Sequence, residues 1–134
     1  HMTSRADNPI GLAVLTAAYR DQGLDIARIH TDPEYLRNAY TWLFQVKSVH
    51  EYAAKSLNAE SYLLVKYEDV LANPVQISRE IADFIGSDNE LRNLPLIESN
   101  RASYHDPDDQ RIEEVWTICG EIAAVLGYND KHAF

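Results

Sequence analysis

One short run of the chain, residues 62–67, has the composition of a β-strand, and its isolation constrains the fold more than any other feature. The run reads Tyr-Leu-Leu-Val-Lys-Tyr, and an apolar run without alternation is typical of a strand that is covered on both faces. A single strand cannot satisfy its own backbone donors and acceptors. We therefore expect this strand to need a partner that the rest of the sequence does not obviously supply.

Two amphipathic helices are predicted before this run. Asn8-Pro9 pairs an N-cap residue with a proline at the first helical position, so residues 10–20 should form a helix that stops at Gly23. The capping-box pattern at residues 31–34 should open a second helix of about 25 residues, because apolar side chains then recur every three to four positions.

Two further helices are predicted after it. An Asn-Pro pair at residues 73–74 should open a helix that ends at Gly86, and a final helix should run from about residue 108 to Gly127. Residues 91–107 are rich in Asn, Ser, Pro and Asp and are expected to form a long loop. The sequence thus predicts a mainly α fold with one or two short strands.

The balance of charge excludes several classes of partner. Among the 134 residues, 12 Lys and Arg stand against 21 Asp and Glu, and the formal net charge is −9 at pH 7. Such a chain repels phosphate backbones and anionic lipids, so we expect neither a nucleic-acid partner nor a membrane partner. Any phosphate that it binds would need a local basic pocket.

Length and cysteine content point to one domain in a reducing compartment. We expect a single domain over residues 3–134, with His1-Met2 as the remnant of a cleaved tag. Cys119 is the only cysteine, so no internal disulfide forms, and the sequence shows no signal peptide and no apolar run of membrane-spanning length. A cytoplasmic location is the expectation.

The general catalytic and metal-binding motifs do not occur in the chain. The sequence has no phosphate loop, no Gly-x-Gly-x-x-Gly loop, no Gly-x-Ser-x-Gly elbow and no His-Glu-x-x-His pair. The acids at residues 106–109, next to His105, offer oxygen ligands, but acids directly before a helix ordinarily interact with the helix dipole. We expect no metal site and no cofactor bound by this chain alone.

The most distinctive unit of the sequence spans residues 62–86. The strand-like run leads into Tyr67-Glu68-Asp69, the Asn-Pro pair follows, and the next helix ends in Phe-Ile-Gly at residues 84–86. This unit resembles the late strand, the Tyr-Glu-Asp turn and the Phe-Leu-Gly helix end of the sulfotransferase family.

The resemblance extends to both sides of this unit. Residues 7–15 are similar to the family's Arg-Asn/Asp-Pro segment, and residues 116–128 are similar to its closing helix. The match covers nearly the whole chain but only the second half of a full-length family member. It implies the helical C-terminal half of the sulfotransferase α/β fold.

The resemblance also implies a sulfate donor, 3′-phosphoadenosine 5′-phosphosulfate, which the family binds through an N-terminal phosphate loop and helix. This sequence has no such segment, and the family's general base would lie in the same missing part. The arginine and serine of the upstream motif align with Asp7 and Leu15, which cannot replace them, although a shift of the alignment gap places Arg5 at the arginine position. Arg101 and Ser103 lie where the family sends a basic loop over the 3′-phosphate. Arg5, Arg101 and Ser103 are therefore the candidate cofactor-binding residues.

Tyr67, Glu68 and Asp69 form a run of chemically active side chains, for which we favour a structural role. At the end of a strand, carboxylates commonly accept hydrogen bonds from turn N–H groups while a tyrosine ring packs. His30 and His50 have no partner at triad or metal spacing and are interpreted as surface or half-buried residues. No catalytic residue is assigned.

The sequence supports two classes of function. In the first, the chain is a truncated or degenerate sulfotransferase-like domain that is not catalytic alone, with a parent activity of sulfuryl transfer to a hydroxyl acceptor. A protein partner or a second copy would then cover its exposed sheet edge. In the second, the chain is a small acidic helical protein-binding module of the inhibitor, immunity or scaffold type, whose negative surface meets a basic partner.

Overall fold

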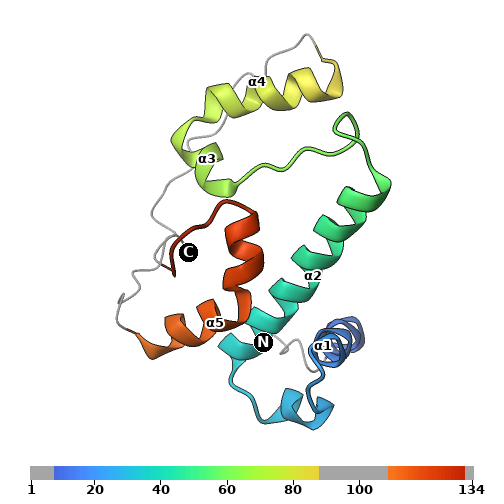
Figure 1. Ribbon diagram of the computed structural model, residues 1–134, viewed down its shortest axis with the longest axis vertical. Helices are drawn as coiled ribbons and strands as arrows, with labels where there is room; N and C mark the ends of the chain where they lie inside the picture. Colours follow the sequence, from blue (N-terminus) through green and yellow to red (C-terminus); the bar gives the residue numbers. More distant parts are fainter. Residues whose placement is uncertain (1–7, 88–108, 132–134) are drawn as a thin grey trace. The chain divides into compact units, whose positions relative to one another are not determined.

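The computed structural model describes residues 8–87 and 109–131 of the chain. These residues form α-helices and one short 3-10 helix, so the mainly helical prediction is confirmed (Figure 1). The chain divides into two compact units: unit 1 is His1–Glu51 with His105–Phe134, and unit 2 is Tyr52–Tyr104. The helices are α1 (Pro9–Asp21), the 3-10 helix η2 (Ile26–His30), α2 (Glu34–Ser56), α3 (Tyr67–Ala72), α4 (Pro74–Ile85) and α5 (Gln110–Val125).

The start and the end of α1 follow the signals in the sequence. The side chain of Asn8 accepts a hydrogen bond of 3.0 Å from the backbone N–H of Ile10. Pro9 lies in the first turn, where backbone N–H groups have no acceptor within the helix, so the proline costs no helical hydrogen bond. Leu15 and Tyr19 form the buried face. Beyond the helix, Gly23 has a φ of 67°, a left-handed conformation that glycine adopts without a steric penalty.

A turn of 3-10 helix, which the sequence analysis missed, connects α1 to α2. The side chain of Asp25 accepts a 2.9 Å hydrogen bond from a backbone N–H of η2. Ile29 of η2 packs with Leu15 and Tyr19 in one buried cluster. The ring of Tyr40 meets that of Tyr19 edge-on, with the centroids 5.1 Å apart. This short helix therefore closes one end of the core of unit 1.

The capping box predicted at residues 31–34 is not formed. The hydroxyl of Thr31 donates to the carbonyl oxygen of Arg28 at 3.4 Å, and α2 begins only at Glu34. The carboxylate of Asp32 is held by the side chains of Tyr19 and Arg28. Because both polar side chains are engaged by the preceding segment, they do not cap the helix that follows.

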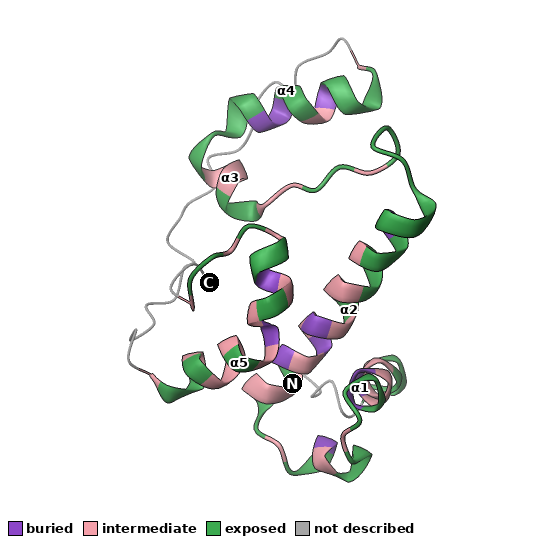
Figure 2. Cartoon of the chain, viewed as in Figure 1, coloured by how far each residue is buried: buried purple, intermediate pink, exposed green. Residues whose placement is uncertain are grey.

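Unit 1 has a second buried cluster where α2 packs against α5. Ala39 and Leu43 of α2 form this cluster with Cys119 of α5. The Sγ atom of Cys119 lies 3.4 Å from the carbonyl oxygen of Ala39, an approach that the small alanine side chain permits. Figure 2 shows buried residues on both helices where they meet.

In unit 2, α4 also begins and ends as the sequence predicts. Pro74 lies in its first turn, and Gly86 follows its last residue with a φ of 71° in the left-handed region. The backbone N–H of Gly86 donates to the carbonyl oxygen of Asp83 at 3.2 Å. Ile77 and Ala82 lie on the buried face of the helix. The prediction of a helix between the Asn-Pro pair and Gly86 is confirmed.

The prediction of a strand at residues 62–67 is wrong. Residues 62–66 have no regular secondary structure, and Tyr67 begins α3. Lys66 has extended backbone angles, with φ −85° and ψ 136°, directly before the helix. The backbone of residues 62–65 makes no hydrogen bond within the described part of the chain. A strand requires a neighbouring strand, and no described residue provides one, so this run is extended chain without a sheet.

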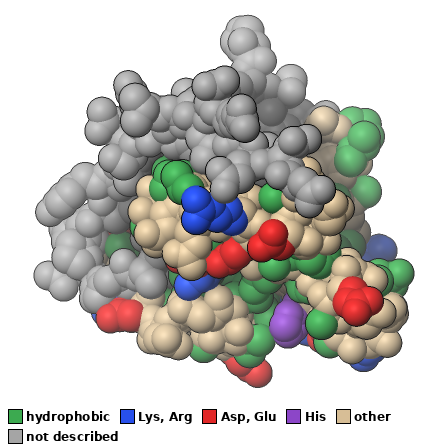
Figure 3. Space-filling view, turned by 90° about the horizontal axis from the view of Figure 1, so that it is seen from above, with side chains coloured by type: hydrophobic (Ala, Val, Ile, Leu, Met, Phe, Trp, Pro, Cys, Tyr) green, Lys and Arg blue, Asp and Glu red, His purple; other side chains and the backbone are tan. Residues whose placement is uncertain are grey.

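Large apolar side chains are exposed in the described ranges. Leu64, Val75 and Ile85 of unit 2 and Val49 of unit 1 are exposed. Figure 3 shows apolar side chains in green among acidic and basic ones on one face. Singly exposed apolar side chains are common on folded proteins and do not by themselves mark an interface.

Candidate functional site

The candidate cofactor-binding residues Arg5, Arg101 and Ser103 lie outside the described residues, as does most of the acidic stretch before α5. Asp109 is described and is the N-cap of α5, because its side chain accepts a 2.9 Å hydrogen bond from the backbone N–H of Arg111. This is the interaction with a helix terminus that the sequence analysis favoured for these acids. No group of three potential metal ligands is found among the residues that the structure describes.

Tyr67, Glu68 and Asp69 lie in the first turn of α3 rather than in a turn that follows a strand. The carboxylates are close to the helix N-terminus, where negative charge interacts favourably with the helix dipole. Oδ2 of Asp69 is 4.0 Å from Nζ of Lys66, and Tyr67 is 58% exposed. A structural role for these three residues stays a prediction. The structure places them at the start of a helix.

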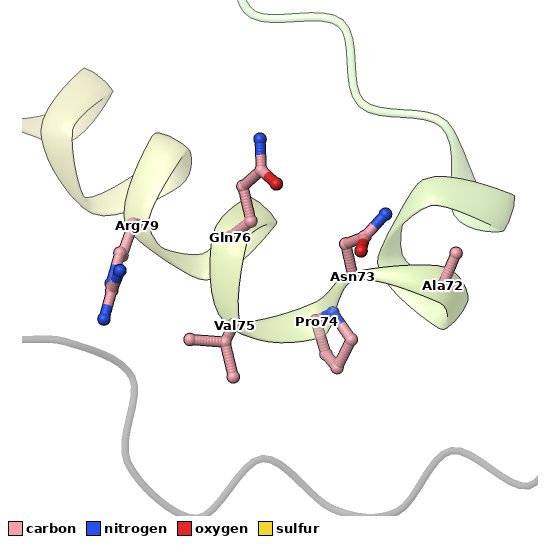
Figure 4. A pocket seen from close by; sticks show the side chains of 6 residues that line it. All are labelled: Ala72, Asn73, Pro74, Val75, Gln76 and Arg79. Atoms are coloured by element: carbon pink, nitrogen blue, oxygen red, sulfur yellow. The ribbon is translucent and has the colours of Figure 1, made fainter.

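A shallow hollow of about 490 Å³ lies at the junction of α3 and α4. Figure 4 shows that its side chains diverge, because Val75 and Arg79 lie on one side of the helix and Gln76 points to the other. A ligand site needs polar groups that converge on one point. We therefore do not assign a site to this junction.

A set of polar side chains surrounds Asp32 in unit 1. The hydroxyl of Tyr19 donates to Oδ2 of Asp32 at 2.7 Å, and Nη2 of Arg28 lies 3.2 Å from the same oxygen. The guanidinium of Arg37 donates to the backbone carbonyl of Asp32 at 2.7 Å. Burial, together with the hydrogen bond to Asp32, raises the pKa of Tyr19 well above its usual range. These groups satisfy one another, so they fix the loop before α2 rather than form an open site.

A long-range hydrogen bond links the start of α2 to α5. The hydroxyl of Tyr35 donates to Oε2 of Glu114 at 2.5 Å, across 79 positions of sequence. The hydrogen bond to Glu114 raises the pKa of the Tyr35 hydroxyl. Tyr35 therefore holds the N-terminal end of α2 against α5 inside unit 1.

A second hollow, of about 370 Å³, lies between α2 and α5 at the C-terminal end of α1. All of its lining residues belong to unit 1. We call this hollow the α2–α5 groove. Its apolar lining residues are Leu43, Ile118, Ile122 and Val125, and its polar ones are Gln22, Lys47, His50, Glu51 and Glu121.

Sequence reasoning did not find the α2–α5 groove. Lys47 and Glu51 are one helical turn apart on the polar side of α2, a spacing that is typical of a solvent-exposed helix face. Glu121 is 70 positions beyond Glu51, and only the packing of Ala39 and Leu43 against α5 brings the two helices together. The apolar periodicity of both helices was visible in the sequence, but it does not indicate that the two helices pack against each other.

None of the described helices combines the length and the apolar character that a membrane span requires. Comparison of the chain with known protein families, with curated proteins and with solved structures finds no match. The residues quoted from the sequence are therefore the whole basis of the sulfotransferase resemblance.

Proposed function

We propose that the chain is a sulfotransferase-like domain that acts by protein binding, adding residues 62–66 as a strand to the sheet of a partner. The observation that carries this proposal is the backbone of residues 62–65, which precedes the hydrogen-bonded start of α3 at Lys66. Residues 62–65 make no backbone hydrogen bond within the described part of the chain, although their sequence is strongly β-prone. Backbone donors and acceptors in this state are a template for strand addition.

The side chains of the run indicate what kind of sheet it fits. Successive residues of an extended chain point to opposite faces, so Leu63 and Leu64 lie on opposite sides of the run. Leu63 is 36% exposed and Leu64 is 49% exposed. A sheet with one solvated face would bury only one of these side chains. The run therefore suits a sheet that is covered on both faces.

Of the strand, turn and helix that the family resemblance implies, the described residues include the helix α4, whereas an extended run and the short helix α3 stand in place of the strand and the turn. The extended run is followed directly by α3 and then by α4, with Pro74 and Gly86 at the two ends of α4. In the resemblance, a strand, the Tyr-Glu-Asp turn and a helix follow one another in this order. Sulfuryl transfer to a hydroxyl is then proposed only for an assembly in which another segment supplies the phosphate loop.

A second candidate function is supported by the charge of the chain. A net charge of −9 on 134 residues fits a small acidic helical module that binds a basic protein, as inhibitor, immunity and scaffold proteins do. In that case association depends on salt and not on residues 62–66. The two functions therefore differ in which substitutions weaken binding.

Sedimentation velocity on the purified chain tests the strand proposal. Without another sheet, two copies should pair through residues 62–66, so the sedimentation coefficient should rise between micromolar and millimolar concentration. Leu64→Lys should abolish this rise, because a charge on a paired and covered strand is unfavourable. Val49→Lys, also at an exposed apolar residue, is the matched control and should leave the rise unchanged. A monomer at every concentration, or equal effects of the two variants, contradicts the proposal.

Calorimetric titration with 3′-phosphoadenosine 5′-phosphate tests the donor part of the resemblance. Selective binding of this nucleotide over ATP, weakened at least about tenfold by Arg101→Ala or Arg5→Ala, supports a phosphate pocket in the chain. Absence of binding removes Arg5, Arg101 and Ser103 as cofactor-binding residues and leaves the strand proposal intact.

A further inference from the structure

The α2–α5 groove combines an apolar floor with charged groups at its rim. Leu43, Ile118 and Ile122 contribute the apolar lining, and Leu43 also belongs to the buried cluster between the two helices. The groove thus rests on the core of unit 1 and not on a loop. A binding site on packed helices keeps its shape without a ligand.

The charges at the rim are unbalanced. Nζ of Lys47 lies 3.7 Å from Oδ2 of Asp21, so this cation already faces a carboxylate. Glu51 and Glu121, one from each helix, line the same groove and are exposed. Neither forms an ion pair within the described part of the chain. The groove therefore presents two carboxylates in excess beside an apolar surface.

The dimensions restrict the size of a ligand. On α2 the lining runs from Leu43 to Glu51, which is about 12 Å at a rise of about 1.5 Å per residue. The volume of about 370 Å³ is at the lower end of the range for small-molecule sites, about 300–1,000 Å³. A bound amphipathic helix needs anchors over a longer groove. The geometry favours a small molecule over a basic peptide.

We propose that the α2–α5 groove binds a small organic cation with an apolar body, such as an aryl-alkyl or branched alkyl ammonium. The apolar body packs on Leu43, Ile118 and Ile122, and the ammonium group lies between the carboxylates of Glu51 and Glu121. The negative charge of the whole chain raises the local concentration of such a cation. This site belongs to unit 1, so it does not depend on the strand proposed for unit 2.

Phenethylammonium is a suitable probe, with 2-phenylethanol as the neutral analogue and phenylacetate as the anionic one. Titrations followed by ¹H–¹⁵N chemical shifts should show saturable binding of the cation, with shifts confined to residues of α2, α5 and the end of α1. The alcohol should bind at least about tenfold more weakly, because it lacks the charge that the carboxylates complement. Phenylacetate should not bind at this site.

Substitutions at the rim test the assignment of the carboxylates. Glu51→Gln and Glu121→Gln should each weaken phenethylammonium binding about five- to tenfold, because each exchange removes one charge from an exposed residue without changing its size. Glu60→Gln, at an exposed residue of unit 2, is the matched control and should have no effect. Leu64→Lys should also leave cation binding unchanged, so failure of this site and failure of the strand proposal are distinguishable.

Three outcomes would overturn the proposal. The first is equal binding of the cation and the alcohol, and the second is binding that both glutamine variants retain in full. The third is the absence of saturable shifts with phenethylammonium. If a Lys- and Arg-rich peptide then produces shifts at the same residues, the groove is assigned to a protein partner.

Discussion

At the scale of single residues, Thr41 illustrates the free-energy cost of a buried hydroxyl group that has no hydrogen-bond partner. Its side chain is 3% exposed, and its Oγ1 atom has no hydrogen-bond partner in the described part of the chain. Thr41→Val removes this hydroxyl with little change in volume, and a desolvated hydroxyl without a partner costs about 1 kcal/mol or more. We expect the variant to raise the free energy of unfolding by about 1 kcal/mol in urea titrations.

Thr16 provides the control for this prediction. Its hydroxyl donates to the carbonyl oxygen of Leu12 at 2.8 Å, so Thr16→Val removes a hydrogen bond and should bring no gain in stability. If both variants change the free energy of unfolding equally, the hydroxyl of Thr41 is not an unsatisfied group.

The thiol of Cys119 should make stability depend on alkaline pH. Burial raises the pKa of Cys119 from 9.0 to about 11. Between these two values the folded chain keeps a proton that the unfolded chain loses, so the free energy of unfolding falls as pH rises from 9 to 11. The contribution is on the order of 2–3 kcal/mol over this interval.

Cys119→Ala isolates this effect, because the tyrosines titrate in both proteins. The difference in unfolding free energy between the two chains should shrink as pH rises through the interval. Parallel pH profiles would show that the thiol ionises normally in the folded chain.

At the scale of one element, the end of α4 depends on the backbone of Gly86. Its φ of 71° is strained for a residue with a Cβ atom, and no neighbouring atom lies within 4 Å of the place where that Cβ would be. Gly86→Ala should therefore lower the free energy of unfolding by about 1 kcal/mol through backbone strain alone. Gly86→Asn should cost less, because asparagine tolerates this conformation better. Thermal denaturation of both variants checks this order, and equal losses would contradict it.

The hydrogen bond between Tyr35 and Glu114 couples α2 to α5. A double-mutant cycle with Tyr35→Phe and Glu114→Gln should give a favourable coupling energy, because the bond involves a carboxylate. Tyr52→Phe, at a tyrosine that is 62% exposed, should change stability by less than about 0.5 kcal/mol. Additive effects in the cycle would mean that the two side chains do not interact in solution.

Local signals explain why some elements were predictable and others were not. Asn8 with Pro9 at the start of α1, and Pro74 with Gly86 at the ends of α4, act through their own backbone and immediate neighbours, so sequence alone located both helices. Residues 62–66 are β-prone, but a strand depends on a neighbour that no local pattern specifies. The capping box predicted at residues 31–34 does not form, because the hydroxyl of Thr31 donates to the carbonyl oxygen of Arg28 in the preceding 3-10 helix.

The whole molecule combines a net charge of −9 with exposed apolar side chains in both units. The charge follows directly from the composition, and what it implies for partners stays a prediction. The α2–α5 groove could not, because it arises when residues about 70 positions apart in sequence line one hollow. Predicting it would have required the pairing of α2 with α5, which helical periodicity alone does not reveal.

Amide hydrogen exchange at residues 62–65 tests the central claim, that this extended run pairs with the sheet of a partner. In the dilute chain these amides should exchange at nearly the rate of an unstructured peptide, because residues 62–65 have no hydrogen-bonded partner in the described chain. In the associated form they should become protected while the exchange of α1 stays unchanged. Protection in the dilute monomer, or an associated form in which these amides remain unprotected, would contradict the claim.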